Sequence, residues 1–180
     1  MVCENRALIT PSSLLRPWRE EDRDSLVTHA DNVQIASYMR DGFPNPYTLA
    51  DADRFIAMAT GDQPHLFLAI EMDGSAVGGI GIYFPGDIYR QTGEIGYWIS
   101  QEYRGRGIVT DAIKVILPVA FKLYDIIRIQ AGVFSNNPGS MRVLIKNGFL
   151  LEAVHKNAIT KYGIILDEYL YVIFRDQIII

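Results

Sequence analysis

Cysteine is almost absent from this chain of 180 residues, which contains only Cys3. A single cysteine cannot form an intramolecular disulfide, and no cysteine or histidine stands near it in the sequence to complete a metal site. The three histidines, His29, His65 and His155, are scattered, and none lies beside a cysteine or a cluster of carboxylates. We therefore expect an inert N-terminal thiol and no metal centre.

Long hydrophobic runs are also missing. No stretch of about 18 consecutive apolar residues occurs, which excludes a membrane-spanning helix. The first residues, MVCENRALITPSS, lack the charged-then-apolar pattern of a secretory signal peptide. The sequence therefore predicts a cytoplasmic protein with no membrane partner.

The chain also has no surplus of positive charge. It contains 17 basic and 21 acidic residues, and its net charge is −4 at pH 7. Domains that bind nucleic acid usually carry a basic surplus, so we expect no nucleic-acid partner. A small acidic surplus is compatible with a cationic substrate such as an amine. The Gly-Lys-Ser/Thr triplet of phosphate-binding NTPases does not occur, which disfavours that class of nucleotide-binding protein.

The composition is that of an ordinary soluble globular domain, with 49% hydrophobic and 21% charged residues. The chain is long enough for one domain with a full core, and it shows no internal repeat, low-complexity segment or linker. We therefore predict a single domain over residues 1–180.

The first half of the chain predicts helices followed by strands. After an extended segment at 14–18, helical patterns cover about 20–31, 32–39 and 49–59, the last with Thr48 as its N-cap. From His65 the hydrophobic period becomes that of a strand. Two such runs flank Asp73-Gly74, a pair that supplies the positive φ values of a tight hairpin turn. A third strand at 93–100 extends the antiparallel meander.

A glycine-rich turn, Arg104-Gly105-Arg106-Gly107, joins this third strand to a long apolar helix. A strand that passes through such a turn into a helix leaves several backbone N–H groups unpaired and pointing one way. The helix dipole and the two arginines favour negative charge at the same place. The turn is therefore a candidate site for a phosphate, although a simple connection with solvated arginines would also account for it.

The second half predicts a buried helix and three more strands. The helix after Gly107 is apolar on nearly every side, and Pro118 within it predicts a kink or an early break. The strand at 126–134 follows a buried helix, so we expect it to pair in parallel with the strand at 93–100. Asn137 caps a further helix that Gly148 ends, and a C-terminal hairpin follows.

Together these elements predict an α/β (α+β) fold in which helices flank a mixed, mostly antiparallel, twisted sheet of six to seven strands.

Four short motifs carry a family resemblance. They are the strand EIGYWI, the turn and helix start RGRGIV, the Asn137-x-x-Ser140 pair, and the sequence KNGF that ends the next helix. With them the chain resembles the GNAT superfamily of acyl-coenzyme A N-acyltransferases, from about Leu15 to Asp167. Within it, the chain is similar to the ribosomal-protein N-terminal and polyamine acetyltransferases.

The resemblance implies an enzyme that transfers the acetyl group of acetyl-coenzyme A, its cosubstrate, to a primary amine by direct attack in a ternary complex. The amine would belong to a small molecule or a protein N-terminus, and no metal would take part. A GNAT-like module that binds acyl-coenzyme A without turnover is the alternative. The resemblance leaves open a monomer or a homodimer, into which the apolar end at 178–180 could be buried.

The resemblance assigns coenzyme-binding roles to the turn and to the strand before it. The backbone donors of the turn and helix start would hold the pyrophosphate, with Val109 standing where the family has a small residue. A bulge late in the strand would expose backbone groups of Ile99 and Ser100 to the pantetheine arm. The residues implied for the pyrophosphate are Arg104, Gly105, Arg106, Gly107, Ile108, Val109 and Thr110.

The resemblance also gives Asn137 a hydrogen bond to the pantetheine arm and makes Ser140 the acid that protonates the departing thiolate. Many relatives place a tyrosine one helical turn later, where this chain has Leu144. Helix capping alone would equally account for Asn137 and Ser140.

Glu94 is the candidate general base, because a carboxylate can accept the proton that an amine loses on attacking a thioester. Strand alternation places Glu94, Gly96 and Trp98 on one face of the sheet. A solvent-facing strand residue is the alternative interpretation of Glu94. Several aromatic residues are candidates for the wall of an acceptor pocket, namely Phe43, Tyr47, Tyr83, Tyr97 and Trp98. The identity of the amine is not encoded in any motif.

Overall fold

The computed structural model describes residues 7–62 and 64–179. Cys3 and Ile180, which figure in the predictions above, lie outside the described residues. No helix in the described part of the chain is long and apolar enough to cross a lipid bilayer.

Eight strands form one sheet in the spatial order β1-β2-β3-β4-β5-β6-β8-β7. Every neighbouring pair is antiparallel except β5 and β6, which are parallel as predicted. The sequence predicted six to seven strands, and the additional one is the two-residue β1, too short to show a hydrophobic period. The strands are β1 Leu8–Ile9, β2 Leu14–Pro17, β3 Leu66–Met72, β4 Ser75–Tyr83, β5 Thr92–Ile99, β6 Arg128–Phe134, β7 Leu150–Lys161 and β8 Ile164–Phe174.

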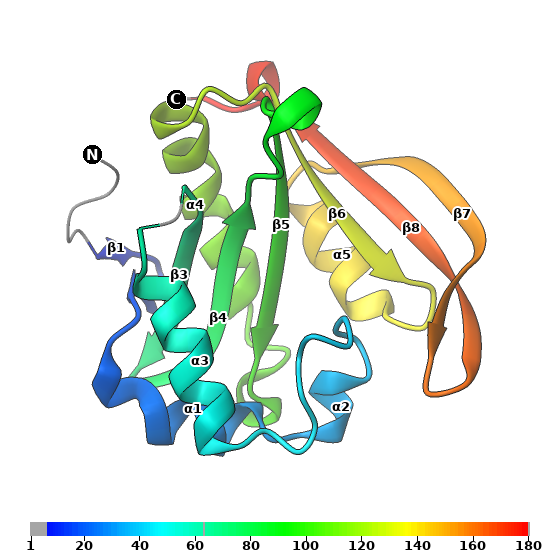
Figure 1. Ribbon diagram of the computed structural model, residues 1–180. Helices are drawn as coiled ribbons and strands as arrows, with labels where there is room; N and C mark the ends of the chain where they lie inside the picture. Colours follow the sequence, from blue (N-terminus) through cyan, green and yellow to red (C-terminus); the bar gives the residue numbers. More distant parts are fainter. Residues whose placement is uncertain (1–6, 63, 180) are drawn as a thin grey trace.

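Helices cover both faces of this sheet (Figure 1). On one face α1, α2 and α3 pack around a cluster that includes Trp18, Ile56 and Trp98. On the other face α4 and α5 cover a larger cluster of aliphatic residues. The α-helices are α1 Arg23–Ala30, α2 Val33–Ala36, α3 Leu49–Thr60, α4 Ile108–Leu123 and α5 Pro138–Lys146, and short 3₁₀ turns are η1 Glu20–Asp22, η2 Asp87–Tyr89, η3 Gln101–Tyr103 and η4 Arg175–Gln177.

Local sequence signals account for many of these boundaries. Asp73 and Gly74 adopt φ of 50° and 83° and turn β3 into β4, as the Asp-Gly pair predicted. Thr48 caps α3, and Asn137 caps α5 with Pro138 at its start. Gly148, at a φ of 84°, follows the end of α5.

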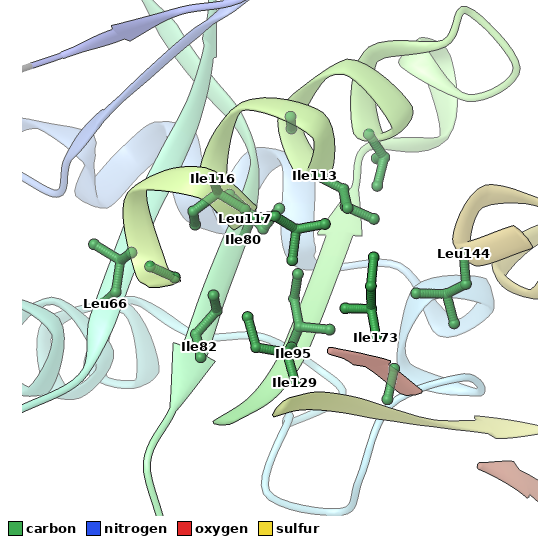
Figure 2. Packing of buried hydrophobic residues seen from close by; sticks show 14 of the residues in the cluster. Leu66, Ile80, Ile82, Ile95, Ile113, Ile116, Leu117, Ile129, Leu144 and Ile173 are labelled. Carbon is green, nitrogen blue, oxygen red and sulfur yellow. The ribbon is translucent and has the colours of Figure 1, made fainter. Parts of the chain in front are cut away.

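Helix α4 continues through Pro118, so the predicted early break does not occur. The proline removes one backbone donor, whose acceptor would be the carbonyl of Lys114 on the exposed side of the helix. The opposite side is firmly packed. Figure 2 shows Ile113, Ile116 and Leu117 of α4 lying against aliphatic side chains of the central strands. Burial of this apolar face outweighs the loss of one solvent-side hydrogen bond.

Strands β5 and β6 pair only over their first three residues, from Thr92↔Arg128 to Glu94↔Gln130. Beyond that point they diverge, and β6 continues beside β8 (Figure 1). The sheet is therefore split along the second half of β5, and the backbone edge of β5 at this split has no neighbouring strand in the described structure.

Candidate active site

A groove of about 1310 Å³ lies at the split between β5 and β6 and extends to both sides of it. We call it the central groove. Its turn end is formed by residues 103–105 and 107–110 and by one side of α5. Its aromatic end is formed by Trp18, Phe67 and the segment 35–58. The second half of β5 lines the passage between the two ends.

The turn end exposes a row of backbone donors. Gly105 and Gly107 have φ of 74° and 82°, and Gly107 precedes the first residue of α4 without any side-chain cap. The first backbone hydrogen bond of the helix is donated by Asp111 to the carbonyl of Gly107, at 3.0 Å. Among the described residues, no acceptor is recorded for the N–H groups of residues 108–110, all of which line the central groove. These donors can bind an anion.

The two arginines of the turn differ in position. Arg104 lines the central groove, whereas Arg106 does not and instead lies over the ring of Tyr103, 5.2 Å from its centroid. Neither has an ion-pair partner within residues 7–62 and 64–179. Arg104 is therefore the side chain of the turn that is placed to meet an anion in the groove.

Val109, where the resemblance implied a small residue, packs into the core cluster beneath α4 and is only 9% exposed. Its isopropyl group is accordingly held mainly by the core. The backbone N–H groups at the start of α4 do not depend on its side chain, so the valine leaves this row of donors unchanged.

Ile99 and Ser100 differ in the direction of their backbone groups. The N–H of Ser100 donates to the carbonyl of Val77 on β4 at 2.8 Å, and its hydroxyl hydrogen-bonds with Nδ1 of His29 at 3.1 Å. Because backbone direction alternates along a strand, the N–H and carbonyl of Ile99 face the split. The backbone N–H and carbonyl of Ser100, which the resemblance implied for the pantetheine arm, are therefore both hydrogen-bonded within the protein, to Val77 and Tyr103. Ile99 lines the groove.

The expected bulge late in β5 is also absent from the pairing with β4. Six successive pairs, from Gly78↔Ile99 to Tyr83↔Glu94, keep a constant register. The free edge of β5 arises instead from the divergence of β6.

Ser140 and Tyr97 meet across the groove. The N–H of Ser140 donates to Oδ1 of Asn137 at 3.1 Å, so Asn137 caps α5. The Ser140 hydroxyl lies 2.7 Å from the hydroxyl of Tyr97 on β5. Burial raises the pKa of Tyr97 to about 12, although its hydrogen bond with Ser140 acts in the opposite direction. The phenol is therefore protonated near neutral pH.

The contact between Tyr97 and Ser140 was not predicted from the sequence, where Tyr97 was only a candidate for the wall of an acceptor pocket. The sequence shows which face of β5 Tyr97 lies on, but it does not show that the side chain contacts a residue 43 positions away. Leu144, where the resemblance implied a tyrosine in many family members, is fully buried in the core and does not line the central groove.

Glu94 lies in the passage, where its side chain is 26% exposed and forms an ion pair with Arg40. Arg40 follows α2 in a segment whose sequence carries no recognisable motif, and its side chain is 76% exposed. Glu94 is therefore accessible from the groove, and an exposed arginine side chain lies beside it.

The described residues contain no group of three or more histidine, cysteine, aspartate or glutamate side chains that could hold a metal ion.

Three kinds of comparison bear on this site. Residues 13–150 match the family model described as "Acetyltransferase (GNAT) domain". The Bacillus subtilis protein described as "Probable N-acetyltransferase YjcK" is 39% identical over 74 residues, a match that covers only 41% of each chain. Another protein of that organism, described as "Uncharacterized N-acetyltransferase YnaD", is 28% identical over 94% of this chain and 98% of its own.

A relative with an assigned substrate is the Escherichia coli spermidine N(1)-acetyltransferase, 28% identical over 77% of this chain and 73% of its own. Among solved structures, Mycobacterium smegmatis RimJ in complex with CoA-disulfide superposes with a TM-score of 0.81 at 26% identity. The superposition covers 97% of this chain and 88% of that protein. The matched family model, the relatives and the shared architecture together establish that the chain belongs to the GNAT acetyltransferase family.

Proposed function

We propose that the protein is an acetyl-coenzyme A-dependent N-acetyltransferase whose acceptor is a primary amine. The observation that carries the proposal is the central groove itself. It joins an anion-binding helix start to the Tyr97–Ser140 pair and to Glu94 in one continuous space.

The turn end fits the phosphates of coenzyme A. Unpaired N–H groups at the start of α4 would hold the pyrophosphate, and Arg104 would add a charge-assisted contact. Two further basic side chains, Arg142 and Lys146, line the same end from α5. The pantetheine arm would then follow the free edge of β5, where the backbone groups of Ile99 face the split.

The reaction requires removal of one proton and delivery of another. The amine nitrogen forms a bond with the acetyl carbonyl carbon, the carbon–sulfur bond breaks, and the sulfur leaves as a thiolate. Glu94 accepts the proton lost by the amine, directly or through a water molecule. Ser140 passes a proton to the thiolate and is reprotonated at the same time by the phenol of Tyr97 in hydrogen-bond contact with it, so no serine alkoxide remains. Tyr97 then recovers its proton from water, and Glu94 releases to water the proton taken from the amine. The protein otherwise acts by holding the two substrates together.

Isothermal titration calorimetry with coenzyme A tests the donor half of the proposal. We expect binding with a 1:1 stoichiometry, whereas no heat at micromolar protein and near-millimolar coenzyme A would refute it. Thiol release from acetyl-coenzyme A with a panel of amines tests the chemical half. We expect Glu94→Gln and Ser140→Ala to slow release, and unchanged rates would refute the assigned roles.

A non-catalytic module that binds acyl-coenzyme A is the second candidate, because the turn end alone suffices for it. That protein would show the calorimetric signal but no amine-dependent thiol release. The Tyr97–Ser140 contact and the open approach to Glu94 favour the enzyme, since a binding module requires neither.

A further inference from the structure

The central groove carries a surplus of positive charge in a chain whose net charge is −4. Five basic and three acidic side chains line it, which leaves two positive charges in excess. The basic residues are Arg40, Arg54, Arg104, Arg142 and Lys146, and the acidic residues are Asp51, Glu94 and Glu168.

At the aromatic end, the carboxylate of Asp51 is already fully engaged. Its Oδ2 accepts hydrogen bonds from the N–H and the hydroxyl of Thr48, at 2.9 and 2.6 Å, and its Oδ1 contacts Arg54. These hydrogen bonds, those from Thr48 first, lower the pKa of Asp51 below its ordinary value. Asp51 therefore serves the start of α3 and has little capacity left for a second cation.

The other two carboxylates of the groove also have partners. Glu94 is paired with Arg40, and Glu168 lies 2.9 Å from Nδ1 of His155. A ligand with a single ammonium group can displace Arg40 from Glu94, because the arginine side chain is largely exposed. A ligand with several cationic groups finds no further unpaired carboxylate along the described lining of the groove.

The walls of the aromatic end are apolar. Phe43 lies 5.9 Å from Trp98 and 5.2 Å from Tyr47, measured between ring centroids, and Trp18 lies edge-on to Phe55 at 5.1 Å. All five side chains line the groove, and Phe43 and Phe55 are only partly buried. Such a surface stabilises an apolar ligand by removing it from water.

We infer that the acceptor is a primary amine with one positive charge on an aromatic or apolar body, and that polyamines are poor acceptors. This inference rests on the proposed acetyl transfer. Arg104, Arg142 and Lys146 lie at the turn end, where the phosphates of the bound coenzyme would neutralise them, so the surplus does not itself repel a polycation from the aromatic end. Asp51 and Glu168 already have partners, so a second ammonium group finds no unpaired carboxylate among the described residues of the groove. A single ammonium beside Glu94 is matched to the one carboxylate placed in the passage.

Steady-state thiol release with acetyl-coenzyme A tests the inference on four acceptors, namely phenethylamine, a tripeptide amide that begins with phenylalanine, ethanolamine and spermidine. We expect kcat/KM for phenethylamine or the tripeptide to exceed that for spermidine and ethanolamine at least tenfold. The ratio of kcat/KM between phenethylamine and the tripeptide shows whether the amine acceptor is a small molecule or a peptide N-terminus. Spermidine equal to or better than both would overturn the inference while leaving the transferase intact. No release with any amine would overturn the proposed function as well.

Two variants test the physical basis. Phe43→Ala removes a partly buried loop ring, and we expect at least a fivefold loss in kcat/KM for phenethylamine with ethanolamine unchanged. Arg54→Gln removes one positive charge from the groove, and we expect about a threefold gain for spermidine. Arg23→Gln is the matched control, because Arg23 pairs with Asp53 but does not line the groove. Equal effects of Phe43→Ala on both amines, or of the two arginine variants on spermidine, would contradict the inference.

Discussion

The two ends of the central groove are built in different ways. The turn end consists mainly of backbone N–H groups within a few residues of one another, at the junction of a turn and α4. The aromatic end consists of side chains from Trp18, α2, the following loop, α3, β3 and β5. A backbone site tolerates changes of side chain, whereas a side-chain site changes its ligand with each substitution. The fold can therefore keep one donor site while the acceptor varies.

The largest effect is expected where the two ends meet. Glu94→Gln keeps the shape of the passage but removes the proposed proton acceptor, so we expect kcat to fall about 10²-fold or more. The affinity for coenzyme A, measured by calorimetry, should stay within about twofold of the unmodified protein because the turn end is untouched.

Glu152→Gln is the matched control for this variant, because Glu152 forms an ion pair with Arg128 but does not line the groove. We expect its kcat to stay near that of the unmodified protein. If both variants lose kcat equally, the loss reflects general damage, and Glu94 has no special role.

The turn end is tested by Gly107→Val. A side chain at a φ of 82° costs about 1–2 kcal/mol and shifts the backbone that presents the donors. We expect coenzyme A to bind about tenfold more weakly, measured by calorimetry, with the KM of the amine little changed.

Gly163→Val is its control, because Gly163 has a φ of 77° with open space around it in the β7–β8 turn. A similar loss of stability without loss of coenzyme binding is expected there. Equal binding by the two variants would show that the start of α4 does not hold the coenzyme.

The sequence was a good guide wherever a signal is local. The Asp73-Gly74 turn, the Thr48 and Asn137 caps, and the glycines before α4 each act within a few residues, and the structure confirms these elements. The parallel pairing of β5 with β6 was also predictable, because a buried helix separates them.

Contacts between residues far apart in the sequence could not be predicted in the same way. Nothing in the sequence of β5 shows that β6 diverges after Gln130, so the free strand edge was attributed to a bulge. The N–H of Ser100 is occupied by Val77, whose position depends on the register of β4. The Arg40–Glu94 pair joins residues 54 positions apart in the sequence and depends on how an irregular loop folds.

A smaller effect is expected from the two arginines of the turn. Arg104→Gln removes a groove-lining charge, and we expect coenzyme A to bind about fivefold more weakly, with the difference shrinking at high salt. Arg106→Gln removes a charge outside the groove, where Arg106 lies over Tyr103, and should change affinity less than twofold. Calorimetry at low and high ionic strength measures both. A larger loss of coenzyme A affinity in Arg106→Gln than in Arg104→Gln would show that Arg106, and not Arg104, contacts the phosphates.

The smallest effect is expected for the hydroxyl of Tyr97, which lines the central groove beside Ser140. Burial raises the pKa of Tyr97 to about 12, above the ordinary value of 10.0 in the unfolded chain. The folded protein therefore retains a proton that the unfolded chain loses. The resulting stability is complete below pH 10 and declines as the pH rises toward 12. Tyr97→Phe abolishes this contribution, so the variant should lose less stability than the unmodified protein between pH 10 and pH 12 in urea unfolding. Parallel losses would show that Tyr97 titrates normally and is not held as a buried phenol beside Ser140.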